Sequence, residues 1–533
     1  MRGTSYRQMA GDLIRQEKGS VPLKKSASVR MALVYPNTYA VGMANMGFQT
    51  VYRLFNLHPD VRCERAFLME APYDRDMRTL ESGERLNRFD VIGFSLSFEL
   101  DFPNMLRCLL QSGISVPRGE RKEKDPLIVL GGAVAGLNPS PLLPFMDGLL
   151  VGEGEGILYQ IADIVSDSRK KRLCREETLG LLSELDGFFV PGMTKSVVRH
   201  IQRPLDVYPT YTPIVTPYSH FENMFVVEVS RGCPQGCFFC AACKIYHPYR
   251  FRSLDSVMNT VKMENPGAQR VGLEGAGLSD YPELEKLFES VIKTGHSLSI
   301  SSIRPNRIQP DLTRLMELGG VRTVTMAPEA GSEDLRRCIG KKIKDEQLLT
   351  SIRLLAETSI KMIKLYFIIG LPGETEDDID AVIQLVKDSA FIFCGKRKRG
   401  RMRISLNAFI PKPFTEFQWS PMFTEKELSR KRTRIRQGLR DVKGVDITTK
   451  STRQEILQGV LSLGDESVGQ AMLDAVQNNV SWKQAFKRRD LDVSSILHAE
   501  RHIDTPLPWD FIESEVPRKT SWTCYQEYRK ECA

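Results

Sequence analysis

Residues 230–240 read Ser230-Arg-Gly-Cys233-Pro-Gln-Gly-Cys237-Phe-Phe-Cys240, so three cysteines are spaced C-x3-C-x2-C on one short stretch. A zinc site usually takes four ligands from two separated pairs, and no matching pair occurs elsewhere in the chain. Three thiolates in one tight turn suit three corners of a cubane 4Fe-4S cluster and leave the fourth iron open. Gly232 and Gly236 would let the loop wrap closely around such a cluster. Three buried cysteines or a zinc knuckle are the alternatives.

The expected state of the other cysteines depends on the cellular compartment of the chain. Residues 1–20 are polar, with no apolar core of a signal peptide, and no apolar run reaches the ~18 residues that a membrane span needs. We therefore expect a cytoplasmic chain with reduced thiols. A fourth thiolate at Cys243 would block the open iron, so we interpret Cys243 as structural, with a substrate-facing role as the alternative. Cys524 and Cys532 are expected to be a free, partly exposed pair in the tail.

Length and charge narrow the class of protein. The chain has 533 residues, of which 41% are hydrophobic and 26% charged. This suffices for two or three packed domains and excludes a disulfide mini-protein, a collagen-like repeat and a disordered tail. Residues 391–533 hold 26 Lys and Arg against 18 Asp and Glu, which accounts for the whole net charge of +8. So mild a charge does not by itself indicate nucleic acid. The basic stretches 396–401 and 430–436 could contact phosphates, or could be a solvated loop and a charged helix face.

The first 190 residues alternate strand and helix patterns. Short apolar runs predict strands, and helical patterns lie between them at residues 48–57 and 103–113. Strand, helix, strand at this spacing predicts a parallel, doubly wound sheet. Ligands of such sheets lie beyond the carboxyl ends of the strands, where this chain has Gly-rich turns. The predicted strands are residues 30–35, 90–97, 127–130 and 145–151.

A second strand–helix series follows residues 191–222, a proline-rich stretch that we expect to be a linker. Parallel strands that are each followed by a helix predict a full or partial barrel, with the active site at the strands' C-terminal ends. The cysteine stretch falls directly after the first of these strands. We expect an α/β domain at 1–190, a barrel at 223–415 and a mainly helical, basic region at 416–533. The predicted barrel strands are residues 224–229, 270–273, 298–301, 323–326, 364–369 and 403–408.

In this context the cysteine stretch resembles the signature of the radical SAM superfamily. The resemblance implies that Cys233, Cys237 and Cys240 bind a 4Fe-4S cluster whose open iron binds S-adenosylmethionine (SAM). It implies that an electron from the cluster cleaves SAM to a 5′-deoxyadenosyl radical, and that a donor such as flavodoxin or ferredoxin supplies electrons. Further matches fall at successive strand ends, although each alone reads as an ordinary βα turn. The residues implied to contact SAM are Phe239, Gly275, Ala276, Ser302, Arg304, Glu329, Ile369 and Gly370.

The first 190 residues resemble the cobalamin-binding domain that many radical SAM enzymes carry. Where that pattern has D-x-H-x-x-G, this chain has Asn37-Thr-Tyr39-Ala-Val-Gly42, so tyrosine replaces the histidine that would bind cobalt. Radical SAM relatives commonly lack this histidine, so bound cobalamin and an empty fold both stay open. Serines would hydrogen-bond the nucleotide tail, and glycines would let the backbone approach it. The residues implied to contact cobalamin are Asn37, Tyr39, Gly42, Ser95, Ser97, Gly131, Gly132, Gly152 and Glu153.

The resemblance extends over roughly residues 30–520 and implies an α/β fold: a flavodoxin-like, cobalamin-binding type domain, then a partial (βα) radical SAM barrel, then a mainly helical region. The first hypothesis is a radical SAM enzyme that uses cobalamin to transfer a methyl group to an unactivated carbon. The second is radical SAM modification of RNA or protein without cobalamin. Methylthiotransfer is disfavoured because Cys63, Cys108 and Cys174 lie far apart. The third is a non-catalytic sensor or scaffold, which the three intact cysteines disfavour.

Overall fold

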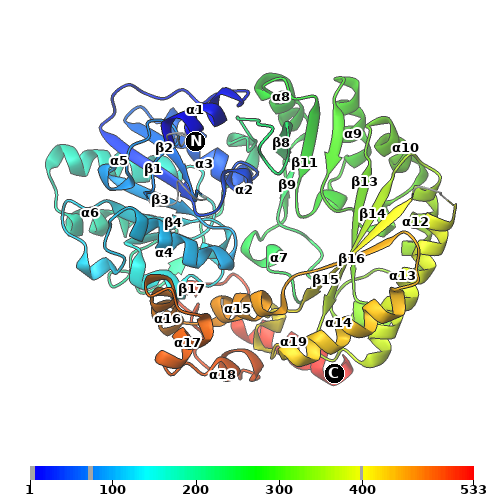
Figure 1. Ribbon diagram of the computed structural model, residues 1–533. Coiled ribbons are helices and arrows are strands. Elements are labelled where there is room, and N and C mark those ends of the chain that lie inside the picture. Colours follow the sequence, from blue (N-terminus) through cyan, green and yellow to red (C-terminus); the bar gives the residue numbers. More distant parts are fainter. Residues whose placement is uncertain (1–5, 70–75, 397–399, 533) are drawn as a thin grey trace, which may run out of the picture.

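The computed structural model describes residues 6–69, 76–396 and 400–532. Figure 1 shows two sheet-containing halves facing each other, the N-terminal half in blue and cyan and the barrel half in green and yellow. The C-terminal helices, in orange and red, join the two halves along the lower side of the view. Within the described ranges, no helix has the length and apolar character needed to cross a membrane.

The N-terminal half contains a six-stranded sheet in the order β2-β1-β3-β4-β5-β6. Five strands are parallel, and β6 runs antiparallel to β5 at the edge. The order 2-1-3-4-5 is that of flavodoxin-like, doubly wound sheets, which confirms the predicted fold class. The strands are β1 (Val29–Tyr35), β2 (Val61–Phe67), β3 (Val91–Ser95), β4 (Leu127–Gly131), β5 (Gly148–Leu150) and β6 (Phe188–Phe189).

Strand β2 escaped prediction because charged residues interrupt its apolar pattern. Its sequence is VRCERAF, yet Glu64 and Arg65 are both buried. Arg65 bonds Glu17 at 2.8 Å and Glu81 at 2.6 Å, so its charge is compensated inside the fold. A buried charge is tolerated only with such partners, and the sequence alone does not reveal them.

Helices cover both faces of this sheet. Helix α3 (Met46–Leu57) begins at Asn45, whose side chain accepts a hydrogen bond from the Phe48 N–H at 2.8 Å and so caps the helix. Together with α5 (Ile157–Lys171) it packs on the face that carries Met31 and Leu33. The opposite face packs on α4 (Phe102–Gln111) and is continuous with the core of the barrel. The N-terminal half also contains α1 (Tyr6–Arg15), α2 (Tyr39–Gly42) and α6 (Arg175–Leu182).

The barrel half consists of two parallel sheets, β12-β11-β8 and β13-β14-β15-β16. The six predicted barrel strands are present within a few residues of their expected bounds. Strand β16 was not predicted, because residues beyond 415 were expected to be helical. The strands are β8 (Met224–Glu228), β11 (Arg270–Glu274), β12 (Ser297–Ile300), β13 (Thr323–Glu329), β14 (Met362–Ile369), β15 (Arg401–Ala408) and β16 (Val445–Thr449).

Helices surround the barrel strands on the outside (Figure 1). In β13, β14 and β15 every second residue is fully buried, and these residues form one core with the surrounding helices. The alternate residues are half-buried and point to the inner side of the barrel, because side chains alternate along a strand. The helices are α7 (Ala242–Ile245), α8 (Leu254–Glu264), α9 (Leu284–Lys293), α10 (Pro310–Leu318), α11 (Glu333–Cys338), α12 (Asp345–Ala356), α13 (Glu376–Lys396) and α14 (Glu425–Leu439).

Residues 191–222, expected to be a linker, run along the first barrel strand. The Thr212 N–H donates to the Val226 carbonyl at 3.0 Å, and the Glu228 N–H donates to the Thr210 carbonyl at 2.9 Å. Upstream, the short strand β7 (Val197–Val198) pairs with β17 (Ile512–Glu513) from the C-terminal region. This stretch therefore contributes contacts to both halves as well as connecting them.

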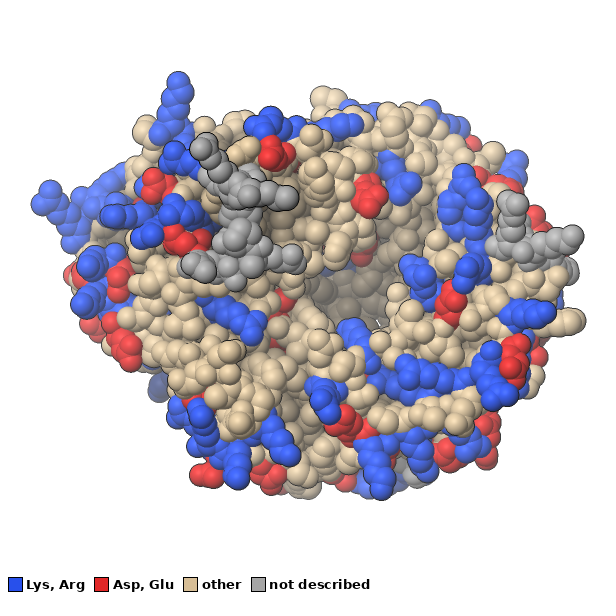
Figure 2. All heavy atoms as spheres, in the orientation of Figure 1, with Lys and Arg blue, Asp and Glu red and all other residues tan. Residues whose placement is uncertain are grey.

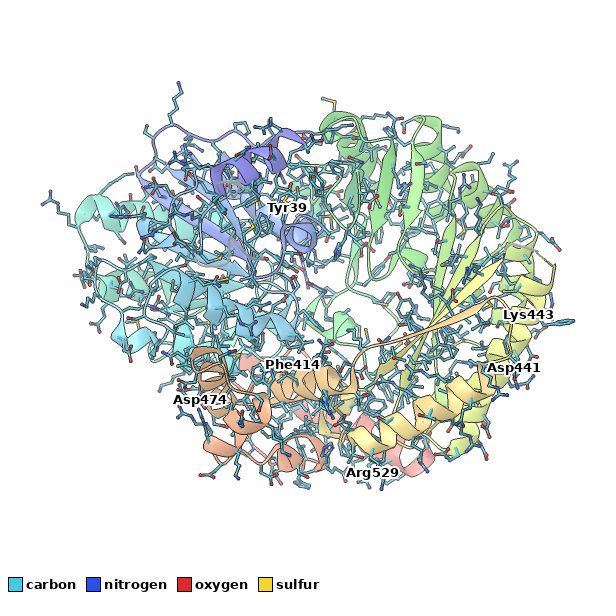
Figure 3. All side chains as sticks on the ribbon, in the orientation of Figure 1. Tyr39, Phe414, Asp441, Lys443, Asp474 and Arg529 are labelled. Carbon is cyan, nitrogen blue, oxygen red and sulfur yellow. A yellow bond between two sulfur atoms is a disulfide. The ribbon has the colours of Figure 1, made fainter. Side chains whose placement is uncertain are left out.

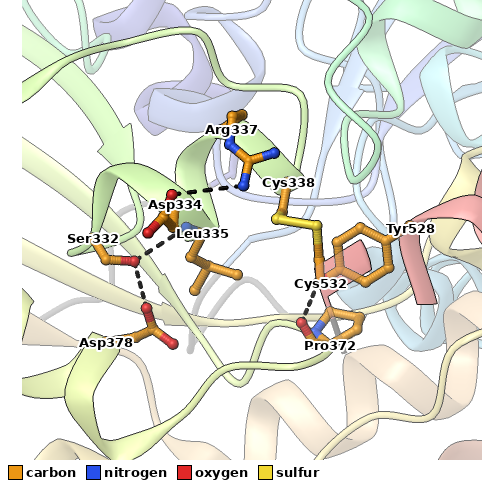
Figure 4. Close-up of a disulfide and its surroundings, with 9 residues drawn as sticks. All are labelled: Ser332, Asp334, Leu335, Arg337, Cys338, Pro372, Asp378, Tyr528 and Cys532. Carbon is orange, nitrogen blue, oxygen red and sulfur yellow. Dashed lines mark hydrogen bonds and ion pairs between the residues drawn. A yellow bond between two sulfur atoms is a disulfide. The ribbon is translucent and has the colours of Figure 1, made fainter. Parts of the chain in front are cut away.

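The C-terminal region is mainly helical, as predicted, and its last helix is tied to the barrel. Helix α19 packs beside α11, and a disulfide joins Cys532 to Cys338 (Figure 4). The expectation of a free Cys524–Cys532 pair is wrong for Cys532, because its partner lies 194 residues away in sequence; Cys524 is unbonded and half-buried. The helices are α15 (Thr452–Leu463), α16 (Glu466–Gln477), α17 (Trp482–Arg488), α18 (Val493–His498) and α19 (Arg518–Cys532).

Candidate functional site

The three-cysteine loop leaves the C-terminal end of the first barrel strand. The ribbon β9 (Ser230–Arg231) and β10 (Arg250–Phe251) frames the loop at its base. Gly232 has φ +79°, and a Cβ there would lie 2.4 Å from the Tyr246 carbonyl oxygen; Gly236 has φ +67°. Residues with side chains rarely adopt such backbone angles, so the two glycines allow the loop to curl back on itself.

A second segment supports this loop from the fourth barrel strand. The Phe238 N–H donates to the Ile339 carbonyl at 3.1 Å, and Gly340 lies against the Cys237 backbone. The ammonium of Lys341 lies 3.4 Å from a Glu329 carboxylate oxygen. A half-buried Lys–Glu pair thus borders the cysteine loop, and its cation would offset the negative charge of thiolates.

Cys243 contacts the loop from inside and is not placed as a fourth ligand. It is buried, and its S–H donates to the Cys240 carbonyl at 3.0 Å. A hydrogen bond from Cys243, helped by backbone N–H groups, lowers the pKa of the Cys240 thiol to about 6. Burial raises the pKa of Cys237 to about 12 and also raises that of Cys233. Cys243 therefore favours the thiolate form of Cys240, and the structural interpretation of Cys243 stays a prediction.

The three cysteines of one loop supply the ligand type that an iron–sulfur cluster uses. Over the described ranges, no three His, Cys, Asp or Glu side chains approach closely enough to hold one metal ion. A cubane cluster instead needs three thiolates spread around a larger body, supplied from one loop with a vacant fourth corner. Cys237 is buried, and Cys233 and Cys240 are half-buried. Three thiolates from one loop match the ligand set of a 4Fe-4S cluster whose fourth iron stays open.

Two of the strand-end segments predicted to contact SAM meet beside the loop. Asp280, which follows β11, forms an ion pair with Arg304 after β12 and accepts a hydrogen bond from Gln235 in the cysteine loop at 3.1 Å. Gly275 lies so close to Ser230 that an added Cβ would be 2.3 Å from its Oγ. Ala276 and Gly275 line one cavity, described below, and Ser302 at the end of the next strand is exposed.

Of the other predicted SAM residues, some lie near the cysteine loop and some lie in the core. Glu329 ends β13 with φ +72°, a left-handed conformation that costs energy for a side-chain residue. Phe239 is partly buried against the core. Ile369 is fully buried, and the Gly370 N–H donates to a Glu374 carboxylate oxygen at 2.8 Å. The structure therefore brings Glu329 close to the cysteine loop, whereas the Ile369 side chain belongs to the core under the helices.

A cavity of about 530 Å³ extends from the N-terminal sheet to the first two barrel strands. We call it the sheet cavity. Apolar residues of the strands and of α3 and α5 form most of its wall, and Glu228, Arg231, Gly275 and Ala276 bound it on the barrel side. Its volume lies within the ~300–1,000 Å³ typical of ligand pockets. The predicted cobalamin-contacting residues that line it are Ser95, Ser97, Gly131, Gly132, Gly152 and Glu153.

The sheet cavity contains features that suit a partly polar ligand. The Thr50 hydroxyl lines it, is buried, and has no hydrogen-bond partner in the part of the chain that the structure describes. A buried hydroxyl without a partner costs free energy that a ligand atom would recover. A Cβ added at Gly131 would meet nothing within 4 Å, so a larger residue there would fill the cavity. Thr50, Asn45 and the apolar face of α3 were missed by the motif search, although helical periodicity marks that face.

The remaining three predicted cobalamin residues do not line the cavity. Tyr39, labelled in Figure 3, donates its hydroxyl to Glu17 at 2.7 Å. A Cβ at Gly42 would lie 2.4 Å from the Phe67 ring, so this glycine allows close packing in the core. The Asn37 amide donates to Asp101 at 2.7 Å. These side chains serve the fold around α2.

A buried ionic network joins the two halves at the base of the cysteine loop. Arg231 lies 3.0 Å from Glu153 and 2.8 Å from Glu155, both in the Gly-rich turn of the N-terminal half. It also lies 2.8 Å from Glu228, which pairs with Arg252. Burial alone would raise the pKa of Glu228, but Arg231 and Arg252 lower it to about 2. The Glu153 carboxylate is therefore already engaged by arginines.

Most of the basic side chains in the stretch 430–436, which could contact phosphates or form a charged helix face, pair with acids of this chain. Arg430 and Arg434 pair with acids of α13, and Lys431 and Arg432 are buried against Glu374 and Glu455. This favours the charged-helix interpretation over a nucleic-acid surface. The other basic stretch, 396–401, includes residues 397–399, which lie outside the described residues.

The chain is similar to known proteins in both of its halves. A family model described as "Radical SAM proteins, N-terminal" matches residues 47–191, and the "Radical SAM superfamily" model matches residues 227–386. An uncharacterized protein of Methanocaldococcus jannaschii is 29% identical over 86% of this chain and 94% of its own length. A putative methylthiotransferase of the same organism is 23% identical over 69% of this chain and 78% of its own length. The solved OxsB structure, described as a cobalamin-dependent S-adenosylmethionine radical enzyme with aqua-cobalamin and S-adenosylmethionine bound, covers 94% of this chain and 79% of its own at 13% identity and a TM-score of 0.47.

Proposed function

We propose that this chain, which belongs to the radical SAM superfamily, holds cobalamin in its sheet cavity and transfers a methyl group to an unactivated carbon of its substrate. The observation that carries the cobalamin part is the sheet cavity itself. It lies beyond the carboxyl ends of a doubly wound sheet, continues to the barrel, and contains a buried hydroxyl without a partner.

Three cysteines would hold the cluster, and the protein would set its surroundings. Cys233, Cys237 and Cys240 would bind three irons, and the cluster with SAM supplies radical chemistry when both are bound. Lys341 would place a half-buried cation beside the thiolates, and Glu329 would hold that cation in position at 3.4 Å. Asp280 would orient Gln235 and Arg304 at the mouth of the loop.

The sheet cavity would hold the nucleotide tail of cobalamin between the sheet and helices α3 and α5. Thr50 would supply a hydrogen bond, and Gly131 would leave room for the ligand. Tyr39 would not reach the cobalt, because its hydroxyl is bonded to Glu17 and its side chain belongs to the core. This segment of the chain would then supply no histidine to bind the cobalt.

The test is anaerobic reconstitution of the full chain with iron, sulfide and hydroxocobalamin, followed by SAM and a reductant. We expect retained cobalamin after gel filtration and formation of 5′-deoxyadenosine. Cys237→Ala should abolish 5′-deoxyadenosine and leave cobalamin retention unchanged. Cys174→Ala is the matched control, because Cys174 is exposed and lies in the N-terminal half.

The two measurements separate the competing functions. Formation of 5′-deoxyadenosine without retained cobalamin would overturn the cobalamin part and favour radical SAM modification of a substrate without it. Retained cobalamin with no SAM cleavage, and no SAM binding to the cluster, would favour a sensor or scaffold.

A further inference from the structure

The inner side of the four-stranded barrel sheet is polar. Half-buried side chains of β14 and β15 alternate with the core residues and face away from the surrounding helices. Tyr366 and Ser405 lie side by side in register, and Asn407 donates to the Ser405 hydroxyl at 3.4 Å. Figure 2 shows a hollow at the centre of the molecule with Lys and Arg side chains along its rim. An inner side of this kind is built for a polar ligand.

Two cations stand next to each other on this inner side. Lys364 of β14 and Arg403 of β15 are direct partners in the parallel ladder, and both are half-buried. Neighbouring strands lie ~4.8 Å apart, so the two side chains leave the sheet close together. We call Lys364 and Arg403 the cation wall. Its neighbour on β13, in register with Lys364, is the neutral Thr325.

Neither cation has an acidic partner among the described residues. The Arg403 Nε is buried and forms no hydrogen bond. Asp446 is in register with Arg403 on β16, but its carboxylate binds Arg401 at 2.9 Å. Three arginines buried elsewhere in the fold, Arg231, Arg252 and Arg432, have close carboxylate partners. A fourth, Arg199, donates instead to the backbone carbonyls of Gly136 and Lys244. The cation wall therefore differs from the charges that stabilise the fold.

Two like charges directly opposite each other on adjacent strands are destabilising. An arrangement of this kind gains free energy when an anion binds between the two groups, since each then donates charge-assisted hydrogen bonds. An arginine fork and a lysine ammonium suit a phosphate or carboxylate oxygen. The uncompensated pair, its half-burial and its polar neighbours together indicate an anion site inside the barrel.

We propose that Lys364 and Arg403 bind an anionic group, phosphate or carboxylate, of the substrate on the inner side of the barrel. The inference rests on the proposed function in treating the barrel interior as the place of the substrate. Its test needs neither SAM nor retained cobalamin, so the two proposals can fail separately.

The test uses the melting temperature of the anaerobically reconstituted full chain at constant ionic strength. Chloride is replaced stepwise by inorganic phosphate in one arm and by succinate in the other. We expect at least one anion to raise the melting temperature. In Lys364→Met and in Arg403→Met the concentration for half of this effect should rise about tenfold. The matched control Lys387→Met with Arg353→Met removes two exposed cations from the outer helices and should leave it unchanged.

A second readout concerns the melting temperature in chloride alone. Because each variant removes a repulsive pair, Lys364→Met and Arg403→Met should melt at higher temperature than the parent chain. A response to phosphate only would indicate a phosphate-bearing substrate, and a response to succinate only a carboxylate-bearing one. Unchanged half-effect concentrations in both variants, or variants that fold less stably than the parent, would overturn the proposal.

Discussion

The sheet cavity and the cation wall show two opposite ways to prepare a surface for a ligand. The sheet cavity is partly open and mainly apolar, and the Thr50 hydroxyl in its wall is buried without a partner among the described residues. The cation wall lines the barrel interior and presents two positive charges that have no acidic partner within the described part of the chain. Both carry a local cost in stability, but the kind of cost differs.

The difference shows which ligand each region is suited to hold. An apolar enclosure gains free energy from the area that a ligand buries, so it suits a group that stays bound. Half-exposed charges attract an ion from solvent and release it more readily, because water competes for it. Under the functions proposed above, the first region suits a resident cofactor, and the second suits a ligand that exchanges in each turnover.

The largest effect is expected at Glu228, in the ionic network that joins the two halves between the sheet cavity and the barrel. Glu228→Gln leaves Arg231 and Arg252 buried without their shared carboxylate, and should lower the free energy of unfolding by about 3–5 kcal/mol. Because its pKa is lowered to about 2 from an ordinary 4.5, its stabilisation is complete above pH 4.5 and is lost as pH falls toward 2. Urea unfolding at several pH values measures both effects.

The exposed Glu289→Gln is the control, since Glu289 pairs with Lys293 on the surface of α9. It should change unfolding very little. Equal behaviour of the two variants would show that the network does not hold the halves together.

Filling the sheet cavity should weaken cobalamin binding without changing the barrel. Gly131→Leu places a side chain into space that is open in the structure, and should weaken cobalamin binding about a hundredfold by steric exclusion. Equilibrium dialysis with hydroxocobalamin gives the affinity. Gly180→Leu, also in open space but on α6 far from the cavity lining, is the matched control. Unaltered binding in Gly131→Leu would place cobalamin elsewhere.

Thr50→Val tests the polar part of the same cavity. Removing a buried hydroxyl without a partner should raise the free energy of unfolding by about 1 kcal/mol in the absence of ligand, and should weaken cobalamin binding about tenfold. Thr313→Val makes a useful contrast, because the Thr313 hydroxyl donates to the Pro310 carbonyl at 2.8 Å and its loss should destabilise. If both variants changed the free energy of unfolding in the same direction, the Thr50 hydroxyl could not be the unpartnered group described here.

The smallest effect is expected where positive charges are already paired. Arg434 lies on α14 beside Asp380 and Glu376, and its side chain is partly exposed to solvent. Arg434→Met should change the melting temperature little, because exposed ion pairs contribute ~0–1 kcal/mol. Arg403→Met, in the cation wall, should by contrast raise it. If the two substitutions gave the same result, the distinction between paired and unpaired cations would lose its physical basis.

Local patterns predicted much of the architecture. The spacing of Cys233, Cys237 and Cys240 placed the loop after a strand, and short apolar runs located most strands. Strand β2 was missed because Glu64 and Arg65 break its pattern although both are buried. Strand β16 was missed because it lies within a region of helical, basic character. Its sequence, VDITT, has only five residues, which is little for a periodicity argument.

Features that depend on distant contacts could not be predicted. The register that puts Lys364 opposite Arg403 appears only when β14 and β15 pair. The Arg231 network needs a turn from the N-terminal half, and the Cys338–Cys532 bond spans 194 residues. For Tyr39 and Gly42 the motif comparison gave positions on the chain but not the direction of side chains, and in the fold they pack in the core. The sequence therefore predicted the cysteine loop better than it predicted which residues line the sheet cavity.

The ionic network at Arg231 has a consequence for how the chain can be divided. A cut within residues 191–222 would look harmless in the sequence, yet it would separate Glu153 and Glu155 from Arg231 and Arg250. Each fragment would then expose charges that are now shielded from water, together with the apolar wall of the sheet cavity. Recombination between relatives that exchanges one half would face the same difficulty unless both sides of the network were inherited together. Exchange of one half would therefore require matching changes in the network residues of the other half.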